Sequence, residues 1–211
     1  MSENAGFQIS LDIQGRLCVA IGGDDETFEK VSRLLDVGAK VIVVNPTLTT
    51  ALKKLTASGK IIHRGRHFRS TDAQDAFLVL NLLREDTDLS KSLFELAKTE
   101  RFLVWSIDQP DRSHFMMPAL IKSGPLRVAI STSGASPALA SELRRYGESI
   151  FDEEFGQFLD SLSALREELK KSEPNDARRR ERLKEAVEGF RFTGTITYPA
   201  SWEAQKKLSA S

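Results

Sequence analysis

Two glycines followed by acidic residues lie where the chain could bind a phosphate group. Gly22 and Gly23 follow a run of apolar residues, and Asp24 and Asp25 precede a segment whose apolar residues have helical spacing. Glycines let backbone N–H groups approach a phosphate closely, and the amino end of a helix favours negative charge. This order predicts the pyrophosphate-binding loop of a dinucleotide such as NAD, with Gly22 as the first required glycine.

The loop also departs from the dinucleotide pattern. Asp24 stands at the second required glycine, and Thr27 stands at the last small residue. A carboxylate at Asp24 would repel a pyrophosphate, although acids here also suit a helix amino end as caps and dipole partners. The next expected strand ends in Asn45 and Pro46, without the acid that often holds the ribose hydroxyls. The loop alone therefore leaves NAD binding and simple helix capping as alternatives.

The elements that must position this loop alternate in type along the first half of the chain. Apolar runs predict buried strands at residues 17–21, 40–44, 61–62, 76–80 and 102–107. Helical spacing predicts helices at residues 27–37, 48–58 and 89–99. Strands that alternate with helices form a parallel sheet with helices on both faces. We therefore predict an α/β fold with a Rossmann-like parallel sheet.

The pattern changes after residue 111. We expect, in order, a helical turn at 118–121, a strand at 126–131, a Ser- and Gly-rich loop at 131–137 and a helix at 138–151. Charged helices follow from 153 to 190, with a break at Glu173-Pro174-Asn175. The sequence from 193 to 211 is polar. The second half is therefore expected to be mainly helical.

Composition narrows the class of protein. The 211 residues carry 30 basic and 30 acidic side chains, so no global attraction to nucleic acid or to an anionic membrane is indicated. The single cysteine, Cys18, lies in an apolar run and is expected to pack in the core. No signal peptide is expected, and no apolar run approaches the ~20 residues that span a bilayer. We expect a cytoplasmic protein.

Three segments in the middle of the chain resemble one family. They are Trp105–Pro110 (WSIDQP), Ser113–Ala119 (SHFMMPA) and Leu126–Ala140 (LRVAISTSGASPALA). Gln14-Gly15-Arg16, Gly38-Ala39-Lys40-Val41 and Val44-Asn45-Pro46 match the same family in the same order. The family is that of precorrin-2 dehydrogenase/sirohydrochlorin ferrochelatase, the N-terminal part of siroheme synthase. The resemblance covers residues 10–150.

The resemblance implies a fold in three parts. They are a Rossmann-like NAD-type domain at residues 1–112, a dimerisation region at 113–150 and a small helical C-terminal domain with a polar tail at 151–211. Such enzymes oxidise precorrin-2 with NAD to give sirohydrochlorin, and some then insert ferrous iron to give siroheme. The family's key carboxylate falls on Asp108, which would act as the catalytic group and contact the metal transiently. A homodimer formed through the region after Asp111 is also implied.

The implied substrate is a tetrapyrrole with many carboxylates, so its site should offer cations and hydrogen-bond donors. The candidates in the matching segments are Arg112, Ser113, His114, Arg127, Thr132, Ser133 and Gly134. The candidates for the cofactor are Gly22, Gly23, Asp24, Asp25, Asn45 and Pro46.

Two departures from the family lie beside the expected NAD site. The family's glycine triplet reads Gly22-Gly23-Asp24, and its Ala-Ala-Thr-Asp element reads Leu82-Leu83-Arg84-Glu85. Arg84 could offset the added negative charge. Three hypotheses follow: an NAD-dependent dehydrogenase with or without iron insertion, an NAD-independent sirohydrochlorin chelatase, and a non-catalytic tetrapyrrole-binding or regulatory protein.

Overall fold

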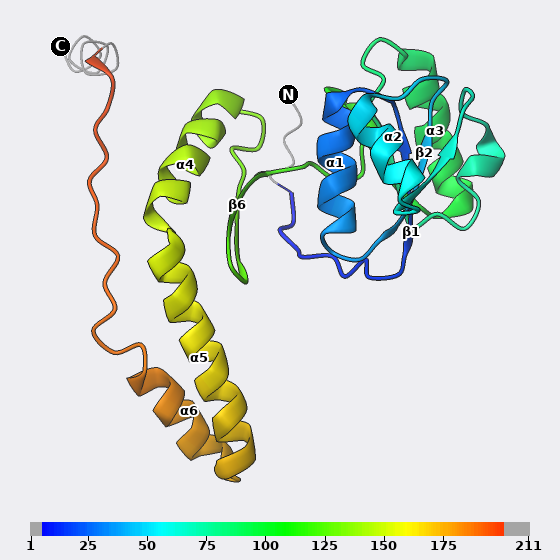
Figure 1. Ribbon diagram of the computed structural model, residues 1–211. Helices are drawn as coiled ribbons and strands as arrows, with labels where there is room; N and C mark the ends of the chain where they lie inside the picture. The colour runs from blue at the N-terminus through cyan, green and yellow to red at the C-terminus, as the bar shows by residue number, and fades with distance from the viewer. Residues whose placement is uncertain (1–5, 201–211) are drawn as a thin grey trace. The chain divides into compact units, whose positions relative to one another are not determined.

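The computed structural model describes residues 6–200 (Figure 1). Within that range the chain forms two compact units. The first comprises residues 6–120 and 129–145, and the second comprises 121–128 and 146–200. Residues 201–211, the end of the expected polar tail, lie outside the described residues.

The first unit is built on a five-stranded parallel sheet, as predicted. The strands are β1 (Leu17–Ile21), β2 (Lys40–Val44), β3 (Ile61–Arg64), β4 (Leu78–Asn81) and β5 (Leu103–Ser106), in the order β3-β2-β1-β4-β5. The helices are α1 (Asp25–Leu35), α2 (Thr50–Ala57) and α3 (Thr87–Glu100), with short turns η1 (Ser70–Asp72) and η2 (Pro110–Arg112). From β1 the chain adds β2 and β3 on one side of β1, and it then adds β4 and β5 on the other side. The direction of strand addition therefore changes between β1 and β4, and open α/β sheets bind ligands at such a point.

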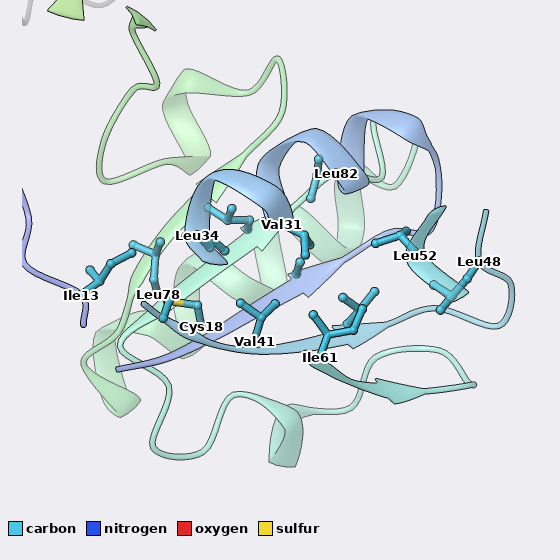
Figure 2. Close-up of a cluster of buried hydrophobic side chains, with 14 residues drawn as sticks. Ile13, Cys18, Val31, Leu34, Val41, Leu48, Leu52, Ile61, Leu78 and Leu82 are labelled. Carbon is cyan, nitrogen blue, oxygen red and sulfur yellow. The ribbon is translucent and has the colours of Figure 1, made fainter. Parts of the chain in front are cut away.

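Side chains on both faces of the sheet are buried, which explains why its central strands are uninterrupted apolar runs. Cys18 and Ala20 of β1 belong to the cluster that packs against α1 and α2 (Figure 2). Val19 and Ile21 point to the other face, where they pack with residues of α3 such as Leu93. Cys18 is fully buried, and this burial raises the pKa of its thiol to about 11.

A two-stranded sheet follows, and it corrects one prediction. Residues 118–121 were expected to form a helical turn, but β6 (Ala119–Ser123) pairs there with β7 (Leu126–Ile130). Pro118 precedes a strand instead of opening a helix, a place where its missing N–H costs no sheet hydrogen bond. Gly124, with φ at 50°, makes the turn between the two strands.

The remaining helices are α4 (Pro137–Ile150), α5 (Glu153–Ser172) and α6 (Asp176–Glu185). The predicted break at 173–175 is confirmed, and Asn175 caps α6 by accepting hydrogen bonds from the backbone N–H groups of Ala177 and Arg178 at 2.9 and 3.2 Å. In the second unit, Phe158 stacks on Phe190 with ring centroids 5.9 Å apart. None of the helices within residues 6–200 has the length and apolar character that a bilayer crossing requires.

Candidate functional site

The glycine loop connects β1 to α1, as predicted, and both glycines are required by close packing. Gly22 has φ at 149°, and a Cβ added to it would meet the Thr27 hydroxyl and lie 3.2 Å from Cβ of Leu82. A Cβ on Gly23 would lie 2.6 Å from Nδ2 of Asn45. The backbone of this loop therefore lies against its neighbours more closely than any side chain would allow.

Asp24 caps the amino end of α1. Its Oδ1 accepts hydrogen bonds from the backbone N–H of Thr27 at 2.8 Å and from the Thr27 hydroxyl at 2.7 Å. Partial burial raises the pKa of the Asp24 carboxyl, but the bonds from Thr27 and the nearby charge of Arg84 outweigh it and hold the pKa below its ordinary value. An ionised carboxylate thus stands at the helix end that a pyrophosphate would use, with Asp25 as the first residue of the helix.

The end of β2 holds its side chains in a local turn. Nδ2 of Asn45 donates to the carbonyl oxygen of Thr47 at 2.7 Å, and Pro46 lies exposed between them. A ring nitrogen of His63 lies 2.9 Å from the Asn45 carbonyl oxygen. The amide group of Asn45 is therefore engaged within its own loop, and no acid takes its place.

Asp108 lies two residues beyond the end of β5, in the left-handed conformation with φ at 56°. The turn that carries it is held by Ser113, whose Oγ accepts from the Ser106 N–H at 2.9 Å and donates to the Gln109 carbonyl oxygen at 2.9 Å. His114 extends the support, since its backbone N–H donates to the Val104 carbonyl oxygen at 2.8 Å. Ser113 and His114 thus use polar groups to shape the turn, and Asp108 keeps a side chain that is 68% exposed.

A groove of about 400 Å³ lies beside Asp108, between the first turns of α3 and η2. Thr87, Asp88 and Lys91 line one side, and residues 108–112 line the other. Lys91 and Arg112 bring positive charge to a groove that also carries acidic side chains. The structure therefore brings two predicted residues, Asp108 and Arg112, to one concave surface.

Arg84 connects the two halves of this edge of the sheet, a link that sequence reasoning missed. It follows β4, and its guanidinium forms ion pairs with Asp108 and with Glu26 in the first turn of α1. The segment before it is fixed at both sides, because Leu82 donates its N–H to the Ile21 carbonyl oxygen at 2.9 Å and Leu83 donates to Asn81 Oδ1 at 3.2 Å. The sequence showed only that a cation, Arg84, lies three residues after the end of β4.

The remaining predicted substrate residues lie around β7 and the loop before α4. Nη1 of Arg127, in the second unit, donates to the carbonyl oxygens of Gly124 and Leu126 at 2.6 and 2.7 Å, so this side chain closes its own turn. Thr132 Oγ1 accepts from the Ser136 N–H at 3.1 Å. Ser133 and Gly134 both have positive φ, at 50° and 85°. These residues form a tightly turned, exposed loop at the start of a helix.

Other parts of the described chain offer weaker candidates for a functional site. Residues 6–200 contain no cluster of three His, Cys, Asp or Glu side chains that could hold a metal. A cavity of about 520 Å³ in the second unit is lined by Phe155, Phe158, Phe190 and acidic residues, and it contains none of the predicted site residues. Chemistry is therefore best sought at the carboxyl edge of the sheet, where a parallel five-stranded sheet and a glycine loop define a Rossmann-type dinucleotide-binding domain.

Comparisons with known proteins agree with this class. The family described as "Putative NAD(P)-binding" matches residues 9–119, and the family described as "Sirohaem biosynthesis protein central" matches residues 123–145. The chain is 32% identical to the siroheme synthase of Thioalkalivibrio sulfidiphilus over 183 residues, 87% of this chain and 37% of the relative. It is 30% identical to that of Xylella fastidiosa over 181 residues, 85% of this chain and 38% of the relative.

A solved structure, "SirC, precorrin-2 dehydrogenase", has the same fold, with a TM-score of 0.73 and 23% identity over 87% of this chain and 90% of that one. The chain belongs to the siroheme synthase N-terminal family. It spans about two fifths of the length of the curated relatives it matches.

Proposed function

We propose that the protein acts in siroheme biosynthesis and catalyses the NAD-dependent oxidation of precorrin-2 to sirohydrochlorin. The observation that carries the proposal is the common edge of the sheet: the Gly22-Gly23 loop ends β1, and Asp108 follows β5 beside a groove. Ligands of open α/β sheets bind at this edge, where the strand order reverses. A cofactor and a substrate would thus meet over β1, β4 and β5.

The loop fits NAD in most respects. The first turn of α1 leaves backbone N–H groups without partners inside the helix, and these would bind a pyrophosphate. Of these backbone N–H groups, that of Thr27 donates a hydrogen bond to Asp24 Oδ1. The two glycines let the loop pack closely against Thr27, Leu82 and Asn45, which fixes its path into the helix. Arg84, Glu26 and the helix end then set the local charge. NAD, when bound, would accept the hydride removed from precorrin-2.

Asp108 would take up the proton that leaves the macrocycle as the hydride departs. Its carboxylate is exposed and lines the groove in which a ring of the substrate would lie. Arg112 would pair with a side-chain carboxylate of the substrate, as would donors of the Thr132–Gly134 loop. A role for Arg127 in substrate binding stays a prediction. Ser113 and His114 would act by holding the turn that carries Asp108.

A second candidate function is favoured by the Asp24 cap. If this carboxylate keeps NAD away, the same edge would serve sirohydrochlorin and ferrous iron as substrates, with Asp108 contacting the iron in transit. A tetrapyrrole-binding protein without turnover is the third alternative. The two activities share Asp108 and differ in their need for NAD.

The deciding experiment is anaerobic conversion of precorrin-2, followed by absorbance, with and without NAD. We expect sirohydrochlorin to form only when NAD is present. Formation of no product with NAD, together with retained binding of sirohydrochlorin, would contradict the dehydrogenase. Ferrous iron added to sirohydrochlorin then tests chelation, by the appearance of siroheme.

We also propose a homodimer formed through residues 113–150. Leu139, Leu143, Tyr146 and Ile150 are exposed on α4 with spacings of four, three and four residues, which place them on one face of the helix. A second copy would cover this apolar stripe. Light scattering should give a dimer for the wild type and a monomer for Leu143→Arg; a monomeric wild type at micromolar concentration would contradict it. The cytoplasmic location stays a prediction.

A further inference from the structure

Arg84 contacts two carboxylates that belong to different elements. One nitrogen of its guanidinium pairs with Asp108, and the other pairs with Glu26 in the first turn of α1. These contacts span 24 and 58 residues of sequence, and they meet at the reversal of the strand order.

The geometry of the guanidinium makes this contact directional. Its donors lie in one rigid plane, so a nitrogen held by Glu26 fixes the direction of the nitrogen that meets Asp108. Glu26 also forms an ion pair with Lys30, whose Nζ lies 4.0 Å from Oε1 of Glu26. The Lys30 side chain is only 12% exposed. Gln109 adds a long contact from the Asp108 turn, with Nε2 3.5 Å from the Arg84 carbonyl oxygen.

Asp108 needs such a partner. The Arg84 guanidinium forms an ion pair with its exposed carboxylate. The backbone of the turn is fixed by Ser113, but that network ends before the carboxylate. A general base must lie within hydrogen-bond reach of the proton it takes, and a displacement of about 1 Å costs on the order of 100-fold in rate.

We propose that Arg84 is a positioning residue for Asp108, with Glu26 as its anchor. The proposal rests on the proposed function, because it assigns Arg84 to the oxidation that Asp108 would assist. It also gives the altered Leu82–Glu85 segment a purpose: this chain orients its carboxylate through a side chain where the family has a small element.

The test replaces Arg84 with Met, which keeps the length and removes the charge. We expect kcat for precorrin-2 oxidation to fall about 10- to 100-fold, while KM for NAD rises by no more than about five-fold, the size expected for loss of one charge near the NAD loop. Glu26→Gln should give a smaller fall, and the double variant should be no worse than Arg84→Met, because both act through one contact. Arg33→Met is the matched control, since Arg33 lies on α1 and its ion pair is with Glu29, outside the contacts of Arg84.

A second readout does not depend on turnover. Hydrogen exchange of the peptide that covers residues 103–114 should be faster in Arg84→Met than in wild type, and unchanged in Arg33→Met. An unchanged kcat in Arg84→Met overturns the proposal, and so does a raised KM for NAD with kcat intact, which would make Arg84 a cofactor ligand. In both cases the wild type still oxidises precorrin-2. A wild type without NAD-dependent turnover contradicts the proposed function itself, and the inference with it.

Discussion

The two halves of the sheet's carboxyl edge use their polar side chains differently. At the ends of β1 and β2, Asp24 bonds to Thr27 and Asn45 bonds to Thr47, so each contact closes within three residues. At the ends of β4 and β5, Arg84 bonds to residues 24 and 58 positions away. The hydrogen bonds of Asp24 and of the Asn45 amide are thus local, whereas those of Arg84 depend on the pairing of strands that are distant in sequence.

The two halves should therefore differ in how well they tolerate substitutions. A local contact can be removed by one substitution with little effect elsewhere, so the departure at Asp24 is reversible. A contact that joins three elements cannot be moved without disturbing its partners.

The catalytic half should fail when its carboxylate is lost. Asp108→Asn should lower kcat on the order of 100-fold or more, because the amide cannot take up a proton. Asn tolerates the left-handed conformation at φ 56°, so the fold should be kept. Anaerobic turnover at saturating NAD measures the effect. Asp75→Asn is the control, since Asp75 also has positive φ, at 60°; equal turnover in the two variants would show that Asp108 is not the base.

The free energy of unfolding should depend on pH through Asp72, which lies in η1 after β3. This carboxyl is buried and bonds to Arg66 with two contacts of 2.7 Å, to Arg64 and to the Arg69 N–H at 2.8 Å. Burial raises its pKa, but these partners together hold the pKa far below the ordinary value. Asp72→Asn should therefore lower the free energy of unfolding at pH 7 by about 1–3 kcal/mol.

The sign of the pH effect follows from the lowered pKa. The contribution of Asp72 is complete above the unfolded-state pKa of roughly 4 and is lost as the pH falls toward the folded-state value. Urea unfolding should show a gap between wild type and variant that shrinks by roughly 1 kcal/mol from pH 7 to pH 3. A gap that does not change with pH would mean that the charge of Asp72 contributes nothing.

Because the glycine loop is closely packed, adding one methyl group to it should lower the free energy of unfolding. Gly23→Ala would place a Cβ against Asn45 and the Thr47 carbonyl, so we expect a loss of about 1–3 kcal/mol in the free energy of unfolding. Gly65→Ala is the comparison, because its Cβ would lie 3.4 Å from the His63 ring, an ordinary contact. Chemical denaturation separates them; equal stability would mean that the loop yields freely.

The smallest effect is expected at Asp24. Asp24→Gly removes one negative charge near the pyrophosphate position, worth about 0.3–1 kcal/mol, so KM for NAD should fall about two- to five-fold. Loss of the cap in favour of glycine should cost only a few tenths of a kcal/mol. Asp152→Gly removes the matching cap of α5 and should leave KM unchanged. An unchanged KM in Asp24→Gly would show that its carboxylate does not oppose NAD.

The same contrast explains how much the sequence predicted. Strands β1 and β2 were predicted with their observed bounds, because central parallel strands are buried on both faces and appear as apolar runs. The cap role of Asp24 was also visible, since capping is a short-range pattern. β6 was missed because its half-buried residues do not alternate cleanly and Pro118 suggested a helix start.

The contacts of Arg84 were out of reach for a different reason. No local pattern relates Arg84 to Glu26, and the two meet only because β4 lies beside β1 in the folded sheet. The ion pairs of Asp72 have a shorter range, since Arg64 ends β3 and Arg66 follows two residues later. Local physical rules predict elements and caps, whereas ion pairs between elements require the topology first.

The burial of Cys18 turns the chain into its own unfolding reporter. It is the only thiol in the sequence, it lies fully buried in β1 between β2 and β4, and its pKa is raised to about 11. Since an exposed thiolate must attack the alkylating reagent, labelling must wait until the central strand opens. The labelling rate at a fixed pH would therefore report how often β1 opens, because no other cysteine contributes to the signal.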